Sequence, residues 1–133
     1  MEKNETVSFI LGGLHFEYDA EKQERNIEKH GISFRAAARV FFDENYIEAY
    51  DEEHSDYEDR YDVIGDASVA GGTAGRTVIG NVESFVGDAR DILYVVYTER
   101  VIEEKAGTEI DVIRLISARL ANDFERGLYY GKI

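Results

Sequence analysis

The feature that most constrains the fold is a continuous apolar run from Ile92 to Tyr97. A run of this kind is typical of a strand that is covered on both faces of a sheet. The segment from Ile110 to Ala118 alternates instead, with Ile110, Val112 and Ile116 on one face. Alternation at every second residue indicates a half-buried strand. The sequence therefore predicts a sheet in which the 92–97 segment is a central strand.

The order of the remaining elements predicts an α+β fold. Two helices are expected early in the chain, one helix at its end, and strands before, between and after them. The expected strands are 15–18, 46–50, 60–65, 92–97 and 110–118, and the expected helices are 20–29, 34–41 and about 121–130. Because consecutive strands are joined by turns, the sheet should be compact and mainly antiparallel, with two N-terminal helices and one C-terminal helix.

Local signals mark the ends of the helices. Asp19 and Ser33 are typical N-cap residues, since their side chains accept hydrogen bonds from the first helical turn. Gly31 can take the left-handed conformation that ends a helix. Within the expected helices, the apolar side chains that should face the core are Ile27, then Phe34, Ala37, Ala38 and Phe41, then Ala121, Phe124 and Leu128.

The length of 133 residues predicts a single domain that spans the whole chain. Residues 66–90 differ in composition from the rest of the chain and are expected to be an insertion or flap. Gly71, Gly72 and Gly75 indicate a flexible loop, and Gly80-Asn81 lies between two β-prone runs as in a hairpin. Deletion of residues 67–87, with the gap closed by a short turn, should therefore leave a folded protein.

The net charge of −13 limits the partners that the protein can bind. Residues 1–65 carry 17 acidic and 7 basic side chains, and residues 66–133 carry 11 and 8. Such a chain repels polyanions at long range, so non-specific nucleic-acid binding is not expected. The sequence has no cysteine, no membrane-length apolar run and no signal-peptide core. These features favour a cytoplasmic protein without a membrane partner.

A set of short motifs, in order, resembles the BrnT family of toxins. The motifs are Phe16-Glu17-Tyr18-Asp19, Lys22, Asn26, Lys29-His30-Gly31-Ile32-Ser33-Phe34, Phe41, Asp43, His54, Glu58, Arg60, Ile64-Gly65, Val95-Val96, Thr98-Glu99-Arg100, Arg114-Leu115-Ile116-Ser117-Ala118-Arg119, Ala121, Glu125 and Tyr129. The resemblance runs from residue 16 to 130, apart from 66–90. It implies a fold similar to RelE-type ribonucleases, RNA cleavage without a metal or cofactor, and translation arrest. It also implies neutralisation by a BrnA-like antitoxin with a ribbon–helix–helix domain, so that DNA is contacted only through the antitoxin.

RNA cleavage without a metal needs a base for the 2′-hydroxyl, cations for the phosphate and an acid for the leaving oxygen. Arginine holds phosphate oxygens in a bidentate fork, and histidine titrates near neutrality. The candidate catalytic residues are His30, Lys29, His54, Glu58, Arg60, Arg100 and Arg119. We expect Arg60, Arg100 and Arg119 to point into one cleft, with His30 or His54 on its rim. Arg114 is a weaker candidate, because it shares strand parity with Val112 and Ile116 and can pair with a carboxylate.

Structural explanations exist for each candidate. Strand-end arginines can pair with carboxylates, His30 and Lys29 suit a helix C-terminus, and His54 lies in an acidic loop. The carboxylates between Asp51 and Asp59 could also bind a hard cation, but their spacing matches no EF-hand loop and a solvated loop is favoured. Two functions from different classes therefore remain. One is an endoribonuclease toxin, and the other is a non-catalytic acidic module that keeps the toxin fold to bind an antitoxin or another basic partner.

Overall fold

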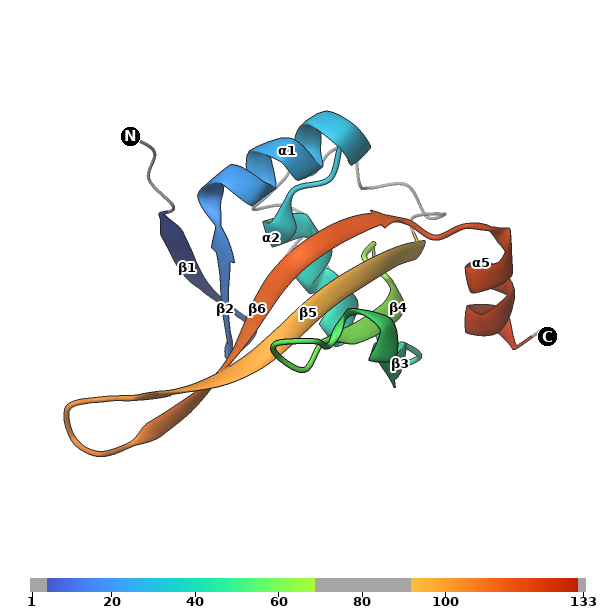
Figure 1. The fold of residues 1–133 in the computed structure, drawn as a ribbon. Coiled ribbons are helices and arrows are strands. Elements are labelled where there is room, and N and C mark those ends of the chain that lie inside the picture. Colours follow the sequence, from blue (N-terminus) through green and yellow to red (C-terminus); the bar gives the residue numbers. More distant parts are fainter. Residues whose placement is uncertain (1–4, 69–91, 132–133) are drawn as a thin grey trace.

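The computed structural model describes residues 5–68 and 92–131 and shows an α+β fold with one six-stranded sheet (Figure 1). The strands are β1 (Thr6–Leu11), β2 (Leu14–Asp19), β3 (Ile47–Tyr50), β4 (Tyr61–Asp66), β5 (Ile92–Glu103) and β6 (Glu109–Leu120). The helices are α1 (Ala20–His30), α2 (Phe34–Ala37) and α5 (Asp123–Tyr130), with 3-10 turns η1 (Ala38–Phe42) and η2 (Glu52–His54). The predicted fold class is confirmed. The expected insertion at 66–90 lies almost wholly outside the described residues.

The sheet is mixed, in the order β1-β2-β6-β5-β4-β3. Four of its neighbouring pairs are antiparallel, as predicted, but β2 pairs with β6 in parallel. The predicted central strand is confirmed, since β5 lies between β6 and β4. The parallel pair joins segments about a hundred residues apart. The sequence prediction considered only strands that follow one another along the chain, so it did not include this pair.

The first strand was not predicted, because only one of its side chains is buried. Phe9 stacks on Phe16 of β2, with ring centroids 5.1 Å apart, while the other side chains of β1 are exposed or half-buried. Gly12 and Gly13 form the turn between the two strands, with φ of 56° and 86°. Glycine adopts this left-handed backbone without a steric penalty.

Helix α1 begins and ends as its sequence predicts. The carboxylate of Asp19 accepts hydrogen bonds from Glu21 and Lys22, and Gly31 closes the helix in the left-handed conformation. The predicted anchor was wrong, however, because Ile27 is 44% exposed. The buried residue is Asn26, whose side-chain amide donates to the carbonyls of Ile32 and Ala118 and accepts from the Ala118 N–H. Asn26 thus continues the hydrogen bonding of β6 beyond the end of β2.

The second predicted helix is only partly α-helical. Ser33 caps it as expected, but α2 has four residues and passes directly into the 3-10 turn η1. This turn packs tightly on β4 at Gly65, where an added Cβ would lie 3.1 Å from the Val40 carbonyl oxygen. A side chain at position 65 would require Val40 or Tyr46 to shift by a few tenths of an ångström. The predicted stripe from Phe34 to Phe41 does face the core, with Phe41 partly buried.

Helix α5 was predicted to turn Phe124 and Leu128 inward, and this prediction was wrong. Phe124 is 60% exposed and Leu128 is 38% exposed. The helix is fixed instead by polar contacts, since Asn122 and Glu125 form a reciprocal capping box and the Tyr129 hydroxyl donates to the buried Asp43. A helix held at its first turn and by one tyrosine can leave its apolar side chains in solvent.

The two faces of the sheet differ in cover. Helices α1 and α2 and turn η1 pack on one face, where the main core lies (Figure 1). We call the opposite face the open face. It is covered at one end by α5, and the β5–β6 hairpin extends beyond the other strands at the other end (Figure 1). Glu17, Arg114 and Arg119 lie on the open face, because they alternate along β2 and β6 with the core residues Phe16, Leu115 and Ala118.

Candidate functional site

The open face carries a first polar group around a buried carboxylate. Glu17 of β2 is 2% exposed and lies beside Arg114 in the register of the parallel pair. Arg114 Nη1 donates to its Oε2 at 2.9 Å, and Arg100 Nη2 donates to its Oε1 at 3.2 Å. Burial alone would raise the pKa of Glu17, but the hydrogen bonds and charges of Arg100 and Arg114 lower it below its ordinary value. Two cations and one anion give this group a net charge of +1.

This group makes the stability depend on pH. The lowered pKa of Glu17 means that its contribution is fully present above the ordinary glutamate pKa and is lost as the pH falls through the folded-state value. We expect Glu17→Gln to lower the free energy of unfolding by about 2 kcal/mol at neutral pH, because two arginines lose their buried partner. Urea denaturation from pH 3 to 7 measures this. The difference in free energy of unfolding between wild type and variant should become smaller at low pH. A difference that does not change with pH would contradict the lowered pKa of Glu17.

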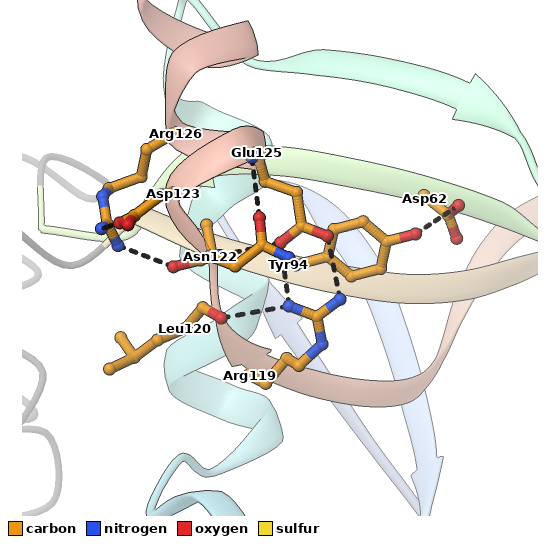
Figure 2. Close-up of polar contacts among 9 residues, drawn as sticks. Asp62, Tyr94, Arg119, Leu120, Asn122, Asp123, Glu125 and Arg126 are labelled. Carbon is orange, nitrogen blue, oxygen red and sulfur yellow. Dashed lines mark hydrogen bonds and ion pairs between the residues drawn. The ribbon is translucent and has the colours of Figure 1, made fainter.

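A second polar group surrounds Arg119, at the end of β6 near α5 (Figure 2). Arg119 Nη1 and Nη2 donate to the two carboxylate oxygens of Glu125 at 2.8 and 2.9 Å. The guanidinium carbon lies 4.3 Å from the centroid of the Tyr94 ring, and the Tyr94 hydroxyl donates to Asp62 Oδ2 at 2.6 Å. A fork held on one edge and stacked on a ring keeps its orientation, which is the condition for binding an oxyanion in a fixed geometry.

The carboxylate of Asp62 connects this group to the acidic loop. Burial, followed by the nearby Asp51 carboxylate, raises the pKa of Asp62 to about 6. Asp51 in turn contacts His54, with Nδ1 3.0 Å from Oδ2. The Asp51 contact raises the pKa of His54, so that the protonated imidazole is favoured. The predicted acidic environment of His54 is therefore present. Within residues 5–68 and 92–131, no group of three or more histidine, aspartate or glutamate side chains is arranged to hold a metal ion.

Lys29 and His30 are the last two residues of α1. Partial burial, the charge of Lys29 and the charge of Arg119 together lower the pKa of His30. The lowered pKa favours the neutral imidazole at pH 7, which is the form that accepts a proton. His30, Lys29 and Arg119 are thus the members of the predicted set that the structure brings near one another.

The three predicted clamp arginines do not meet at one point. Arg119 lies opposite Tyr94, six residues before Arg100 on β5, and a rise of about 3.3 Å per residue separates the two positions by about 20 Å. Arg60, just before β4, donates to Glu58 at 3.2 Å instead. The expectation of strand-end arginines in one cleft failed because each arginine has its own carboxylate partner.

Several members of the two groups were missed as site residues. Tyr94 and Asp62 have no sequence signal that distinguishes them from other strand residues, and Asp51 was considered only as one of the carboxylates that could bind a hard cation. Glu17 and Glu125 are part of the motifs that resemble BrnT toxins, and the expected pairing of Arg114 with a carboxylate points to the same contacts. The partners themselves follow only from the strand register and the position of α5.

The family model of the ribonuclease toxin BrnT, of type II toxin–antitoxin systems, matches residues 18–74. This part of the chain is BrnT-like. The resemblance predicted from the sequence is thereby confirmed over residues that include His30, Lys29, His54, Glu58 and Arg60. Arg100, Arg114 and Arg119 lie beyond the BrnT-like match. A comparison with curated proteins finds no match. In the part of the chain that the structure describes, no helix is both long and apolar enough to cross a membrane.

Proposed function

We propose that the protein is the toxin of a type II toxin–antitoxin pair and cuts RNA at the group around Arg119. The proposal is supported by the fixed guanidinium of Arg119 and by a BrnT-like sequence that contains His30, whose pKa the charge of Arg119 helps to lower. Cleavage by such a site needs no metal. The proposal includes translation arrest in the cytoplasm and neutralisation by a BrnA-like ribbon–helix–helix antitoxin, through which alone DNA would be contacted.

In this mechanism the three residues divide the chemistry between them. His30 takes the proton of the RNA 2′-hydroxyl, and the 2′-oxygen attacks the adjacent phosphorus. Arg119 and Lys29 stabilise the negative charge that builds on the phosphate oxygens, and the leaving 5′-oxygen takes a proton from water. The expected products are a 2′,3′-cyclic phosphate and a free 5′-hydroxyl. Arg60, Glu58 and His54 have no step in this mechanism.

The Glu17 group supplies a second cation site on the same face. Its net charge of +1 and the 50% exposure of the Arg100 side chain allow contact with a neighbouring part of the RNA backbone. A protein with a net charge of −13 can hold RNA only where such cations are concentrated. We therefore expect Arg100 to contribute to RNA binding rather than to the reaction at Arg119.

A cleavage assay tests the proposal. Purified protein should cut a mixed-sequence RNA in the presence of EDTA, and its induction should arrest growth. Failure to cut any RNA, with growth arrest also absent, would favour the second function, a non-catalytic module that binds a basic partner. The observation that favours this alternative is that Arg60, Arg100, Arg114 and Arg119 all contact carboxylates.

The role of His30 predicts a specific pH dependence. Because its pKa is lowered, cleavage should rise with pH and reach a plateau, with the midpoint below the ordinary histidine value. His30→Gln should lower the rate about 100-fold and remove this rise. The control is His15→Gln, since His15 lies on β2 outside the Arg119 group. If both variants keep the wild-type rate and pH profile, His30 is not the base.

A further inference from the structure

Four polar side chains, Asp51, Asp62, Tyr94 and Arg119, follow one another across the open face from the end of β3 to β6. The Asp51 N–H donates to the Arg60 carbonyl, two residues before Asp62, so the two aspartates are diagonal neighbours on one face. Asp62 and Tyr94 are diagonal neighbours on β4 and β5, and Tyr94 is opposite Arg119 on β6. The loop that follows β3 is thereby connected to Arg119.

The two aspartates form a carboxyl pair with little access to solvent. Asp51 is buried, and the carboxyl groups of Asp51 and Asp62 lie within hydrogen-bond reach of each other. Asp62 Oδ2 accepts from the Tyr94 hydroxyl at 2.6 Å, whereas the buried Oδ1 has no hydrogen-bond donor near it among the described residues. Two ionised carboxylates would repel each other in this position. A proton on Asp62 Oδ1, donated to Asp51, gives both groups a partner.

The surroundings of the pair place this proton on Asp62. His54 Nδ1 lies 3.0 Å from Asp51 Oδ2, and a protonated imidazole favours the ionised form of Asp51. Burial alone would raise the pKa of Asp51, but hydrogen bonds from His54 and Asp62 lower it. For Asp62, burial, followed by the Asp51 carboxylate, outweighs the Tyr94 hydrogen bond and raises the pKa to about 6. The opposite directions are expected when one carboxyl group donates its proton to the other.

The charge of Asp62 acts on Arg119. The Tyr94 ring stacks on the guanidinium while its hydroxyl donates to Asp62 (Figure 2). The hydrogen bonds and charge of Glu125 raise the pKa of Arg119, and the charge of Asp62 adds to this effect. With Asp62 protonated, Arg119 and Glu125 sum to zero charge, and ionisation of Asp62 makes the sum −1. The same negative charge that stabilises the guanidinium repels a phosphate bound to it.

We propose that Asp51 and Asp62 share one proton, and that loss of this proton as the pH rises weakens phosphate binding at Arg119. The second half rests on the proposed ribonuclease function, in which Arg119 holds the phosphate. The titratable and charged groups that face Asp62 from the neighbouring elements are Asp51, His54, Glu48, Tyr94, Arg119 and Glu125.

A comparison of wild type with Asp62→Asn isolates the pair from these neighbours. The pKa of Glu125 is lowered and those of Tyr94 and Arg119 are raised, so these three keep their charge state between pH 5 and 8. His54 and Glu48 are present in both proteins. Asparagine copies the protonated aspartate, because its amide group can donate to Asp51 and its oxygen can accept from Tyr94.

Carbon-13 NMR of the aspartate carboxyl groups tests the shared proton without RNA. The Asp62 carboxyl should titrate at about pH 6 in the wild type. Asp51→Asn should lower this midpoint by about one pH unit or more, because no like charge remains beside Asp62. The control Asp111→Asn, at an exposed position on β6, should leave it unchanged. A midpoint that Asp51→Asn does not lower is set by burial alone and overturns the shared proton.

Urea denaturation gives a second measure of the pair. Because the pKa of Asp62 is raised, its protonation favours the folded state below the ordinary aspartate pKa, and this contribution is lost as the pH rises through about 6. Relative to Asp62→Asn, the unfolding equilibrium constant of the wild type should therefore rise about tenfold from pH 5 to 8. A ratio that stays constant over this range also overturns the shared proton.

Binding of a DNA tetranucleotide, which lacks the 2′-hydroxyl and cannot be cut, tests the link to Arg119. Relative to Asp62→Asn, the Kd of the wild type should rise about threefold from pH 5 to 8, and Arg119→Ala should abolish this difference. Equal pH dependence of Kd in wild type and Asp62→Asn overturns the link to Arg119. A protein that binds no oligonucleotide and cuts no RNA sinks the ribonuclease proposal, whereas the carboxyl titration still decides the shared proton.

Discussion

Replacement of Arg119 by alanine should lower RNA cleavage about 1,000-fold, the largest effect on activity that we expect from one substitution. A guanidinium that is oriented before the reaction stabilises charge on the phosphate without reorganisation, and removal of one such contact costs about 10²–10³ in rate. Arg119→Lys should recover only part of the loss, because lysine keeps the charge without the planar fork that Glu125 and Tyr94 hold. Single-turnover cleavage of a short RNA measures both variants.

The matched control is Arg126→Ala. Arg126 pairs with Asp123 at the start of α5, and it also donates to the Ala121 carbonyl, so its loss perturbs the same helix end (Figure 2). Arg126→Ala should leave the cleavage rate within about twofold of wild type, since solvent-exposed ion pairs contribute little to stability. Melting curves for all variants separate folding from catalysis. If activity and melting temperature fall in parallel across the three variants, Arg119 is a structural ion-pair partner and the proposed site is wrong.

Replacement of Asn26 by leucine should have the largest effect on stability, about 3–4 kcal/mol. The substitution leaves the N–H and carbonyl of Ala118 and the carbonyl of Ile32 without the partners that Asn26 provides. Each buried polar group left without a hydrogen bond costs about 1–3 kcal/mol. Equilibrium urea denaturation gives the free energy of unfolding.

Two comparisons sharpen this test. Asn26→Asp keeps an acceptor for the Ala118 N–H but loses the amide donor, so it should also destabilise. Ile27→Ala, the neighbouring residue of α1 at 44% exposure, should cost less than about 1 kcal/mol, because little apolar area is lost. Equal losses for Asn26→Leu and Ile27→Ala would show that α1 is held by its apolar side chain, as the sequence alone suggested.

The parts of the fold that were predicted correctly depend on neighbouring residues. Asp19, Gly31 and Ser33 cap helices through contacts within a few residues, so their sequence context is sufficient. The apolar run at 92–97 predicts a central strand because it contains no charged side chain, and in the structure Tyr94 and Val96 are half-buried while the other four residues are buried. A contact between distant residues leaves no such local signal. The sequence therefore could not predict that Asn26, and not Ile27, anchors α1, because Asn26 bonds to Ala118, which is 92 residues away.

In the candidate site, too, the sequence determined some features and the tertiary structure determined others. The sequence determined which cations and histidines are present, and its ordered motifs determined the BrnT-like resemblance. Only the tertiary structure decided which of them meet. The parallel pairing of β2 with β6 places Glu17 between Arg100 and Arg114, and the position of α5 places Glu125 on Arg119. Electrostatic partners are selected by distance in space, which strand register and helix docking set, whereas sequence patterns record only the type and spacing of residues along the chain.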